Sequence, residues 1–320
     1  MIIPVFIPHE GCPNDCAFCN QRTISGNNTA PDINQTRILI EKYLEGGKKA
    51  SQIAFFGGSF TGIPTDKQNA YLELAYEYIK KNLADSIRIS TRPDYIDSEI
   101  VKRLSFYGVK NTELGAQSMA DDVLKRSNRG HSKCDVERAA EIINDAKVVL
   151  GLQMMTGLPG DSKEKCMYTA HRFKELGAKE SRIYPTVVLR GTMLEKMYAS
   201  GEYIPQSVEE AVEISAHVYR YFTDNDIKVL RIGLPDSIEL KENYVAGAYH
   251  PSMGELVMSR DLRNRIEEKL DTRKEAVILV NPKFISKANG NKRCNIEYFS
   301  SKGIKIVFKE DEKVREFEIQ

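Results

Sequence analysis

Three cysteines, Cys12, Cys16 and Cys19, lie within eight residues near the start of the chain. They follow a short apolar run, residues 2–8, that has the composition of a β-strand. Three thiolates on one loop suit a cubane iron–sulfur cluster with one iron left open. The alternative is a zinc site, which needs a fourth ligand such as His9 or a remote cysteine. Residue types and spacing leave both open.

Other residues that could carry chemistry stand at or near the ends of later strand-like runs. Gly57, Gly58 and Ser59 close the run 52–56, and paired glycines let a backbone approach a ligand closely. Four more polar side chains follow or end later runs: Ser90, Gln117, Arg129 and Gln153. Each alone is typical of a solvated loop. Together they indicate a site, because α/β barrels place active sites at the carboxyl ends of their strands.

A strand-then-helix rhythm supplies the scaffold for these residues. Strands are predicted at 2–8, 52–56, 86–90, 111–114, 148–155 and 182–189, and helices at 66–83, 97–107, 135–146, 163–176 and 208–225. Parallel strands need crossover helices, so the alternation predicts a parallel sheet. We expect an α/β fold, a partial (β/α)6 TIM-like barrel, although a doubly wound sheet also fits six strand–helix units. Later residues predict a small α+β appendage, with a helix at 260–270 and strands at 276–280, 294–299 and 304–308.

Length and composition indicate the class of protein. The 320 residues are 41% hydrophobic and 28% charged with a net charge of +1, which is ordinary for a globular protein. We expect residues 1–260 to form a core with its extension, and 261–320 to form the appendage. No apolar stretch approaches the roughly 18 residues of a membrane span, and the N-terminus lacks the features of a signal peptide. These features predict a cytoplasmic protein with no membrane partner.

The cysteine loop resembles the signature of the radical S-adenosylmethionine (radical SAM) superfamily, Cys-x3-Cys-x-aromatic-Cys, with Phe18 as the aromatic residue. The resemblance implies a [4Fe–4S] cluster on the three cysteines and S-adenosylmethionine chelated to the open iron. It also implies reductive cleavage of S-adenosylmethionine to a 5′-deoxyadenosyl radical that abstracts a hydrogen atom. A flavodoxin- or ferredoxin-like protein would then donate the electron.

An ordered set of later motifs resembles the radical SAM core of the Elongator catalytic subunit and, more distantly, oxygen-independent coproporphyrinogen oxidase. These motifs lie at 90–94, 113–118, 128–131, 151–160, 191–194, 230–235 and 247–251. The resemblance implies that 57–59 hold the methionine amino group and that Arg129 pairs with the carboxylate. Ser90, Gln117 and Gln153 fall where relatives contact the ribose and adenosine. Relatives of the coproporphyrinogen type have acids at the positions of Ser90 and Gln153.

The chain departs from the Elongator subunit after residue 260. That subunit carries an acetyltransferase domain, and the roughly 60 residues that follow residue 260 here are too few for one. No acetyl-CoA site is therefore carried over.

The appendage offers a local clue to the substrate. Residues 281–305 contain one acid, Glu297, and a local charge of +5. The bases are Lys283, Lys287, Lys292, Arg293, Lys302 and Lys305. Such a stretch can bind a phosphate backbone or can be a solvated strand edge. With the Elongator resemblance, it favours tRNA modification at a wobble uridine.

Substrate-side candidates are Tyr184, Arg231, Tyr249 and His250, although Tyr184 could be core and His250 could make a structural hydrogen bond. Two other readings remain open. One is a radical SAM enzyme acting on a small molecule such as a porphyrin-like carboxylate. The other is a zinc-stabilised binding module without enzymatic activity.

Overall fold

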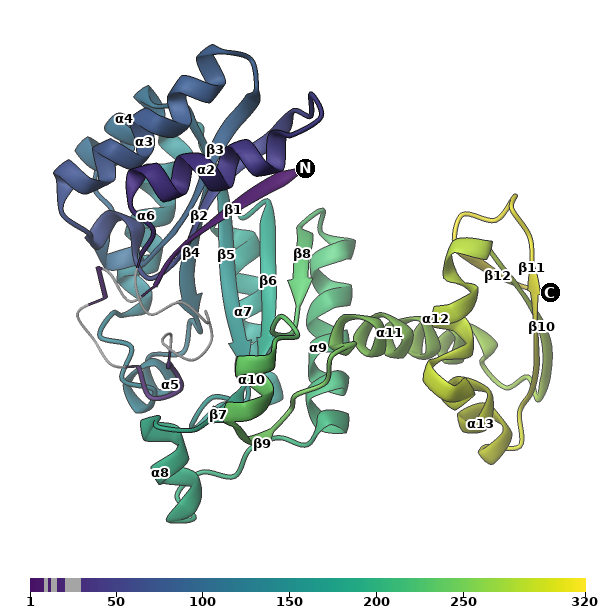
Figure 1. Cartoon of the computed structure of the whole chain (residues 1–320). Coiled ribbons are helices and arrows are strands. Elements are labelled where there is room, and N and C mark those ends of the chain that lie inside the picture. The colour runs from purple at the N-terminus through teal and green to yellow at the C-terminus, as the bar shows by residue number, and fades with distance from the viewer. Residues whose placement is uncertain (9–10, 13–15, 21–29) are drawn as a thin grey trace.

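The computed structural model describes residues 1–8, 11–12, 16–20 and 30–320. Within these residues the largest element is a seven-stranded sheet, ordered β1-β2-β3-β4-β5-β6-β8, in which every neighbouring pair is parallel. The strands are β1 (Ile2–Ile7), β2 (Ala50–Gly57), β3 (Ala84–Thr91), β4 (Val109–Gln117), β5 (Val149–Thr156), β6 (Glu180–Pro185) and β8 (Lys228–Ile232). The sheet curls into an open half-barrel (Figure 1). The expected partial barrel is confirmed, with β8 as an added edge strand.

Helices connect the strands and cover the outer face of the sheet (Figure 1). They are α2 (Ile33–Leu44), α3 (Thr65–Lys80), α4 (Ser98–Phe106), α5 (Asp121–Arg126), α6 (Lys133–Asp145), α7 (Lys163–Glu175) and α9 (Val208–Asp224). Local sequence sets where they begin: Ser207 and Glu210, for example, cap each other's backbone at the start of α9. The predicted helices in this region are confirmed, and α2 and α5 were not predicted.

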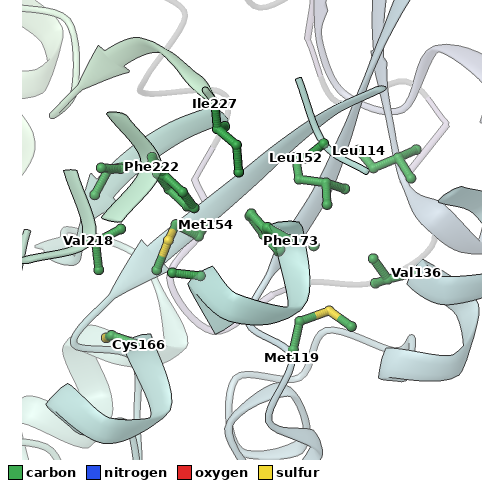
Figure 2. Packing of buried hydrophobic residues seen from close by; sticks show 14 of the residues in the cluster. Leu114, Met119, Val136, Leu152, Met154, Cys166, Phe173, Val218, Phe222 and Ile227 are labelled. Atoms are coloured by element: carbon green, nitrogen blue, oxygen red, sulfur yellow. The ribbon is translucent and has the colours of Figure 1, made fainter. Parts of the chain in front are cut away.

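Two hydrophobic clusters hold this layer together. One lies between β1–β4 and helices α2–α4. The other lies between β4–β6 and helices α6, α7 and α9, where Leu152, Met154, Phe173 and Phe222 pack (Figure 2). Successive side chains of β5 point to opposite faces of the sheet. Met154 is buried in this core, whereas the next residue, Met155, faces the inside of the barrel and lines its cavity.

The predicted strand 182–189 is wrong as a single element. Strand β6 ends at Pro185, and β7 (Val187–Leu189) leaves the sheet to pair antiparallel with β9 (Tyr244–Gly247). Proline has no backbone N–H for the ladder, which explains the break. Helices α8 (Met193–Ala199) and α10 (Ile238–Asn243) flank this two-stranded ribbon (Figure 1).

The appendage stands beside the barrel at the end of α11 (Met253–Leu270) and has its own hydrophobic cluster (Figure 1). A three-stranded sheet, β11-β10-β12, packs against α11, α12 (Ile285–Asn289) and α13 (Cys294–Ser301). Its strands are β10 (Glu275–Val280), β11 (Lys305–Glu310) and β12 (Phe317–Ile319). The predicted strand 294–299 is wrong, since it is α13, whose buried Asn295 and Phe299 lie four residues apart on one helical face. Residue 260 lies within α11, and the division there stays a prediction. In the described residues, no helix combines the length and apolar character needed to cross a membrane.

Candidate cofactor and substrate cavity

A cavity of about 430 Å³ opens at the carboxyl ends of the barrel strands. This volume falls within the roughly 300–1,000 Å³ typical of small-molecule sites. The structure brings many of the sequence candidates into its wall: Cys12, Phe18, Cys19, Gly57, Gly58, Ser90, Gln117, Arg129, Gln153, Tyr184 and Arg231. Residues far apart in the chain therefore meet in one place, as the strand-end argument required.

Four candidates lie outside the cavity wall. Cys16 and Ser59 are buried just behind it, through contacts described below. Tyr249 and His250 are elsewhere. The Tyr249 hydroxyl donates to Asp236, and burial followed by this contact raises the Tyr249 pKa to about 12. His250 Nδ1 accepts from the Ser252 backbone N–H at 3.0 Å, beside the start of α11.

Backbone contacts fix the described part of the cysteine loop. Ala17 N donates to Ser127 O at 2.9 Å, and Ala17 O accepts from Leu194 N at 2.7 Å. Gly11 and Gly62 meet so closely that a Cβ on Gly62 would lie 2.3 Å from the Gly11 oxygen. The loop is thus held against the turn after β2, against the end of α5 at Ser127 and against the start of α8 at Leu194.

No group of three His, Cys, Asp or Glu side chains is placed to hold a metal ion in the described ranges, and His9 lies outside them. Burial, and next the neighbouring Cys16, raise the pKa of the Cys12 thiol. The assignment of the three cysteines as ligands remains a prediction.

Arg129 connects the cysteine loop to the barrel. Its Nη1 donates to Cys16 Sγ at 3.0 Å and its Nη2 donates to Gly115 O at 2.6 Å, while its guanidinium lies 5.9 Å from the Phe18 ring centroid. A Cβ on Gly115 would lie 3.5 Å from Arg129 Nη2, an ordinary contact, but 3.1 Å from Gln117 Nε2, which would have to shift slightly. Arg129 therefore puts positive charge directly beside a cysteine sulfur.

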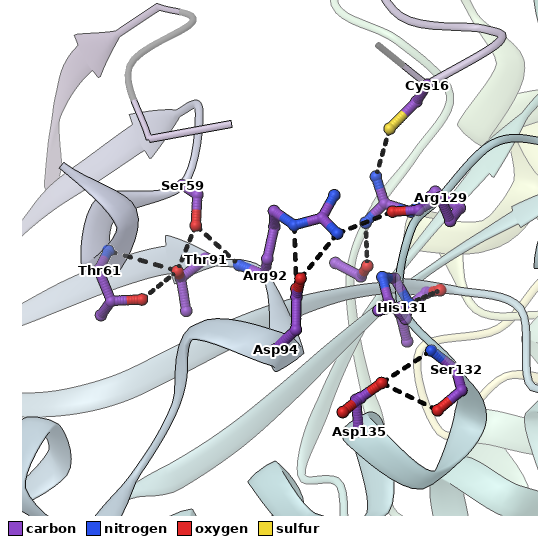
Figure 3. A network of polar contacts seen from close by, with 12 residues as sticks. Cys16, Ser59, Thr61, Thr91, Arg92, Asp94, Arg129, His131, Ser132 and Asp135 are labelled. Carbon is purple, nitrogen blue, oxygen red and sulfur yellow. Dashed lines mark hydrogen bonds and ion pairs between the residues drawn. The ribbon is translucent and has the colours of Figure 1, made fainter. Parts of the chain in front are cut away.

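A second buried arginine, Arg92, was missed by sequence reasoning. It is 3% exposed, its Nε and Nη2 contact Asp94 at 2.9 and 3.0 Å, and Nη2 also donates to Arg129 O at 2.7 Å (Figure 3). Its backbone N–H donates to Ser59 Oγ at 3.2 Å. In the sequence the Arg-Pro-Asp run reads as a turn, and only its place after a barrel strand could have drawn attention to it.

Ser59 belongs to a cluster of buried hydroxyls under the Gly-Gly turn. Thr91 Oγ1 lies 2.8 Å from Ser59 Oγ and 2.6 Å from Thr61 Oγ1 (Figure 3). These contacts tie the turn after β2 to the end of β3. Ser59 thus positions the turn from behind, while Gly57 and Gly58 face the cavity.

The polar atoms of the wall fit a polar ligand. Ser90 Oγ, Arg92 Nη1 and Gln117 Oε1 are buried and have no hydrogen-bond partner among the described residues. Buried polar atoms normally have partners, so three such atoms around one cavity indicate that a ligand completes them. Gln117 also has a left-handed backbone, with φ of 66°, which is a strained conformation that functional sites often contain. Sulfur, hydroxyl, amide and guanidinium donors together suit S-adenosylmethionine beside an iron–sulfur cluster.

Charged side chains fill the barrel floor below the cavity. Glu113 is 1% exposed and accepts from Arg182 Nε at 2.6 Å, Arg88 Nη1 at 2.8 Å and Gln153 Nε2 at 2.9 Å. Burial alone would raise the Glu113 pKa, but Arg182 and then Arg88 hold it below its usual value. Arg88 also pairs with Glu180 at 2.7 Å. Gln153 is therefore fixed from below, which orients its side chain in the cavity wall.

His131 stands behind the same wall. Burial, reinforced by the positive charges of Arg129 and Arg92, lowers its pKa to about 3. Its Nε2 lies 3.2 Å from Ala116 O (Figure 3). The ring stays neutral at physiological pH, and it packs the loop that carries Arg129.

Comparison with known families identifies the superfamily of the chain. The model of the radical SAM superfamily matches residues 6–173, more than half of the chain. The chain belongs to the radical SAM superfamily. The model of the radical SAM C-terminal domain matches residues 178–263. The protein is therefore a radical SAM iron–sulfur enzyme whose cofactors are a [4Fe–4S] cluster and S-adenosylmethionine, and the zinc-module reading is wrong.

Individual relatives are distant. An uncharacterized protein of Methanocaldococcus jannaschii is 26% identical over 250 residues, 76% of this chain and 74% of that protein. A tRNA uridine(34) acetyltransferase of the same organism is 25% identical over 300 residues. That match covers 85% of this chain but 54% of the acetyltransferase, so the radical SAM chain spans about half of that relative.

Solved structures agree on the fold. The archaeal Methanocaldococcus infernus Elp3 superposes with a TM-score of 0.67 at 23% identity, over 86% of this chain and 65% of that chain. Coproporphyrinogen III oxidase from Escherichia coli superposes with a TM-score of 0.52 at 16% identity, over 70% and 52%. At these identities the likeness shows a shared radical SAM fold.

Proposed function

We propose that Cys12, Cys16 and Cys19 hold the [4Fe–4S] cluster and that the cavity beside them receives S-adenosylmethionine. When bound and reduced, the cluster supplies reductive cleavage of S-adenosylmethionine for hydrogen abstraction from the substrate. Cys12 and Cys19 line the cavity and Cys16 is directly behind it. This common location at the end of β1 supports the assignment.

The protein's own residues would bind and orient S-adenosylmethionine. Arg129 and the unpartnered Nη1 of Arg92 supply positive charge for its carboxylate on the cysteine side of the cavity. The turn 57–59 offers backbone groups for its amino end. Ser90 Oγ and Gln117 Oε1, both without described partners, are suited to the hydroxyl and amide-like groups of ribose and adenine. Gln153 is proposed for the same contacts.

We propose tRNA as the substrate, with a wobble uridine as the modified base. The observation that carries this proposal is the match of 85% of the chain to a tRNA uridine(34) acetyltransferase. Acetyl transfer is not included, because the chain spans about half of that relative. We also propose a flavodoxin- or ferredoxin-like electron donor, which the one-electron chemistry requires, and a cytoplasmic location.

The appendage, residues 261–320, supports RNA binding with part of its basic stretch. Lys302 pairs with Glu267 at 2.5 Å and Lys305 approaches Glu275 at 3.8 Å, so their charges are partly compensated. Lys292 and Arg293 are exposed and form no ion pair with a described residue. This basic turn lies beside α11, which joins the barrel to the appendage: Asn295, two residues after Arg293, donates to Ser259 Oγ of α11 at 3.0 Å. An extended substrate such as tRNA can contact both.

Reconstituted enzyme with S-adenosylmethionine tests the proposal by gel-shift titration with bulk tRNA. We expect binding that weakens steeply with salt and weakens further when Lys292 and Arg293 both become Glu. The matched control changes Lys147 and Lys179 to Glu. These exposed lysines precede β5 and β6, at the opposite end of the strands from the cavity. Equal loss in both double variants, or no binding by the unaltered enzyme, would contradict the RNA proposal.

A second candidate substrate is a small polycarboxylate, such as a porphyrin-like compound. The observation in its favour is that the described cavity wall contains arginines and no aspartate or glutamate. Stoichiometric binding of coproporphyrin III without any tRNA binding would favour this candidate.

A further inference from the structure

The cavity wall has an uneven charge. Its described residues include four arginines, Arg92, Arg129, Arg182 and Arg231, and no acidic side chain. S-adenosylmethionine carries one carboxylate, which the two arginines beside the cysteine loop suffice to bind. The other two arginines therefore need a separate explanation.

Arg182 and Arg231 form a second pair on the far strands of the sheet. They lie on β6 and β8 and are Cα partners in the β6–β8 register. Arg129 follows β4, three strands from β8, and adjacent strands are about 4.8 Å apart. Arg182 on β6 and Arg231 on β8 are thus about 10 and 14 Å from the end of β4 along the sheet, and the two pairs mark different parts of the cavity.

The two members of this second pair differ in charge compensation. Arg182 donates twice to Glu113, at 2.6 and 3.1 Å, and its guanidinium lies 5.3 Å from the Phe56 ring centroid. Arg231 is exposed at the rim, its Nε donates to Gly233 O at 3.1 Å, and it forms no ion pair with a described residue. Arg182 is therefore fixed in place, and Arg231 has donors to spare.

Tyr184 completes the group. It follows Arg182 by two residues on β6, so both side chains point to the same face, and both line the cavity with Arg231. Burial raises the Tyr184 pKa while the charges of Arg182 and Arg231 oppose this, which is consistent with a hydroxyl close to both guanidiniums. A protonated phenol on the same face of β6 as Arg182 can donate to an oxyanion in the cavity.

The charges of the barrel floor do not neutralise the region around Arg182, Tyr184 and Arg231. Arg88 and Arg182 are balanced by Glu113 and Glu180, the two carboxylates of the barrel floor. Arg231 is left as one uncompensated positive charge at the mouth of an otherwise largely apolar wall formed by residues such as Leu189, Leu234 and Pro235. An anionic group of the substrate would neutralise it.

We propose that Arg231 and Tyr184, backed by Arg182, form an oxyanion subsite for the substrate, distinct from the S-adenosylmethionine contacts. Resting on the proposed function, the oxyanion is a phosphate flanking the modified uridine. Contact with that phosphate would place the nucleoside in the cavity by its backbone, independently of base identity.

The test measures anisotropy of a fluorescent anticodon stem-loop RNA on the reconstituted enzyme with S-adenosylmethionine bound. We expect Arg231→Gln to weaken binding about 10- to 100-fold, the range for a charge-assisted contact. The matched control is Arg138→Gln, an exposed arginine of α6 on the outer face. Thermal unfolding checks that both variants fold. A second RNA carries neutral methylphosphonates on both sides of the uridine, and against it Arg231→Gln should cause little further loss.

Two further arms separate the possible failures. If Arg231→Gln binds the natural RNA as tightly as the unaltered enzyme, the subsite is refuted while the RNA function stands. If no RNA binds but coproporphyrin III binds and loses affinity in Arg231→Gln, the oxyanion subsite stands, its anion is a carboxylate, and the proposed function falls. Both proposals are overturned if neither probe binds. They are also overturned if only coproporphyrin III binds and its affinity is unchanged in Arg231→Gln.

Discussion

Replacing Glu113 with Gln should strongly destabilise the barrel. The glutamate is 1% exposed and receives hydrogen bonds from Arg88, Arg182 and Gln153 at 2.6–3.1 Å. Glutamine keeps the shape but removes the charge and turns an amide NH2 toward guanidinium donors. Removing one partner of a buried ion pair typically costs about 3–5 kcal/mol. We expect a loss of this size at neutral pH.

The assay is urea unfolding followed by circular dichroism, with Glu141→Gln as the control. Glu141 is an exposed residue of α6, and its change should stay within about 0.5 kcal/mol. The difference between the unaltered enzyme and Glu113→Gln should also depend on pH. Because the Glu113 pKa is lowered in the folded state, its stabilisation is complete above the ordinary value of 4.5 and disappears as pH falls through the folded value. The two curves should therefore converge in acid.

Unfolding of Glu113→Gln at the same urea concentration as Glu141→Gln would contradict this prediction. That result would mean that the two arginines are solvated or paired in some other way in solution. A loss that persists unchanged down to pH 3 would also contradict it, because the charge would then not be the cause.

Three further predictions concern the walls of the cavity. Stability should decline as pH falls from about 6.5 toward the folded His131 pKa of about 3, because unfolding frees the ring to take up a proton; His131→Gln should flatten this part of the urea-unfolding profile. Gly62→Ala would place a Cβ 2.3 Å from the Gly11 oxygen and should lower both stability and iron content, whereas Gly254→Ala, with no atom nearer than 3.7 Å, should leave iron content unchanged. Arg129→Ala should raise the S-adenosylmethionine Kd by about 10-fold or more in equilibrium dialysis, and an unchanged Kd would remove Arg129 from the carboxylate contacts.

Local sequence signals were enough to predict the barrel and much of its cavity. The cysteine loop and several polar residues could be recognised because they follow predicted strands. A parallel topology brings the ends of those strands to one edge of the sheet. Arg231 was identified through the motif 230–235, which resembles Elongator relatives, and Tyr184 through its place in the predicted strand 182–189. Tyr249 and His250 were chosen from the motif 247–251, which contributes no residue to the described cavity wall; they lie in the β9–α11 connection, where they contact Asp236 and Ser252.

Long-range pairing could not be predicted in this way. Glu113 and Arg182 lie inside strands, where a charged residue normally indicates a solvent-facing side. Only the curled sheet brings the two side chains together, so that each charge compensates the other. Arg92 depends on Asp94 and on a backbone oxygen 37 residues away. In the appendage, 294–299 alternates like a strand, and packing against α11 is what makes it a helix.

Anaerobic reconstitution with iron and sulfide, dithionite reduction and chromatographic measurement of 5′-deoxyadenosine test the central claim most directly. The unaltered enzyme should bind four irons and produce 5′-deoxyadenosine from S-adenosylmethionine. Cys16→Ala should lose both properties while keeping its circular dichroism, and Cys134→Ala, which changes an exposed cysteine of α6, should keep both. Full 5′-deoxyadenosine production by Cys16→Ala would contradict the assignment of the cluster to this loop.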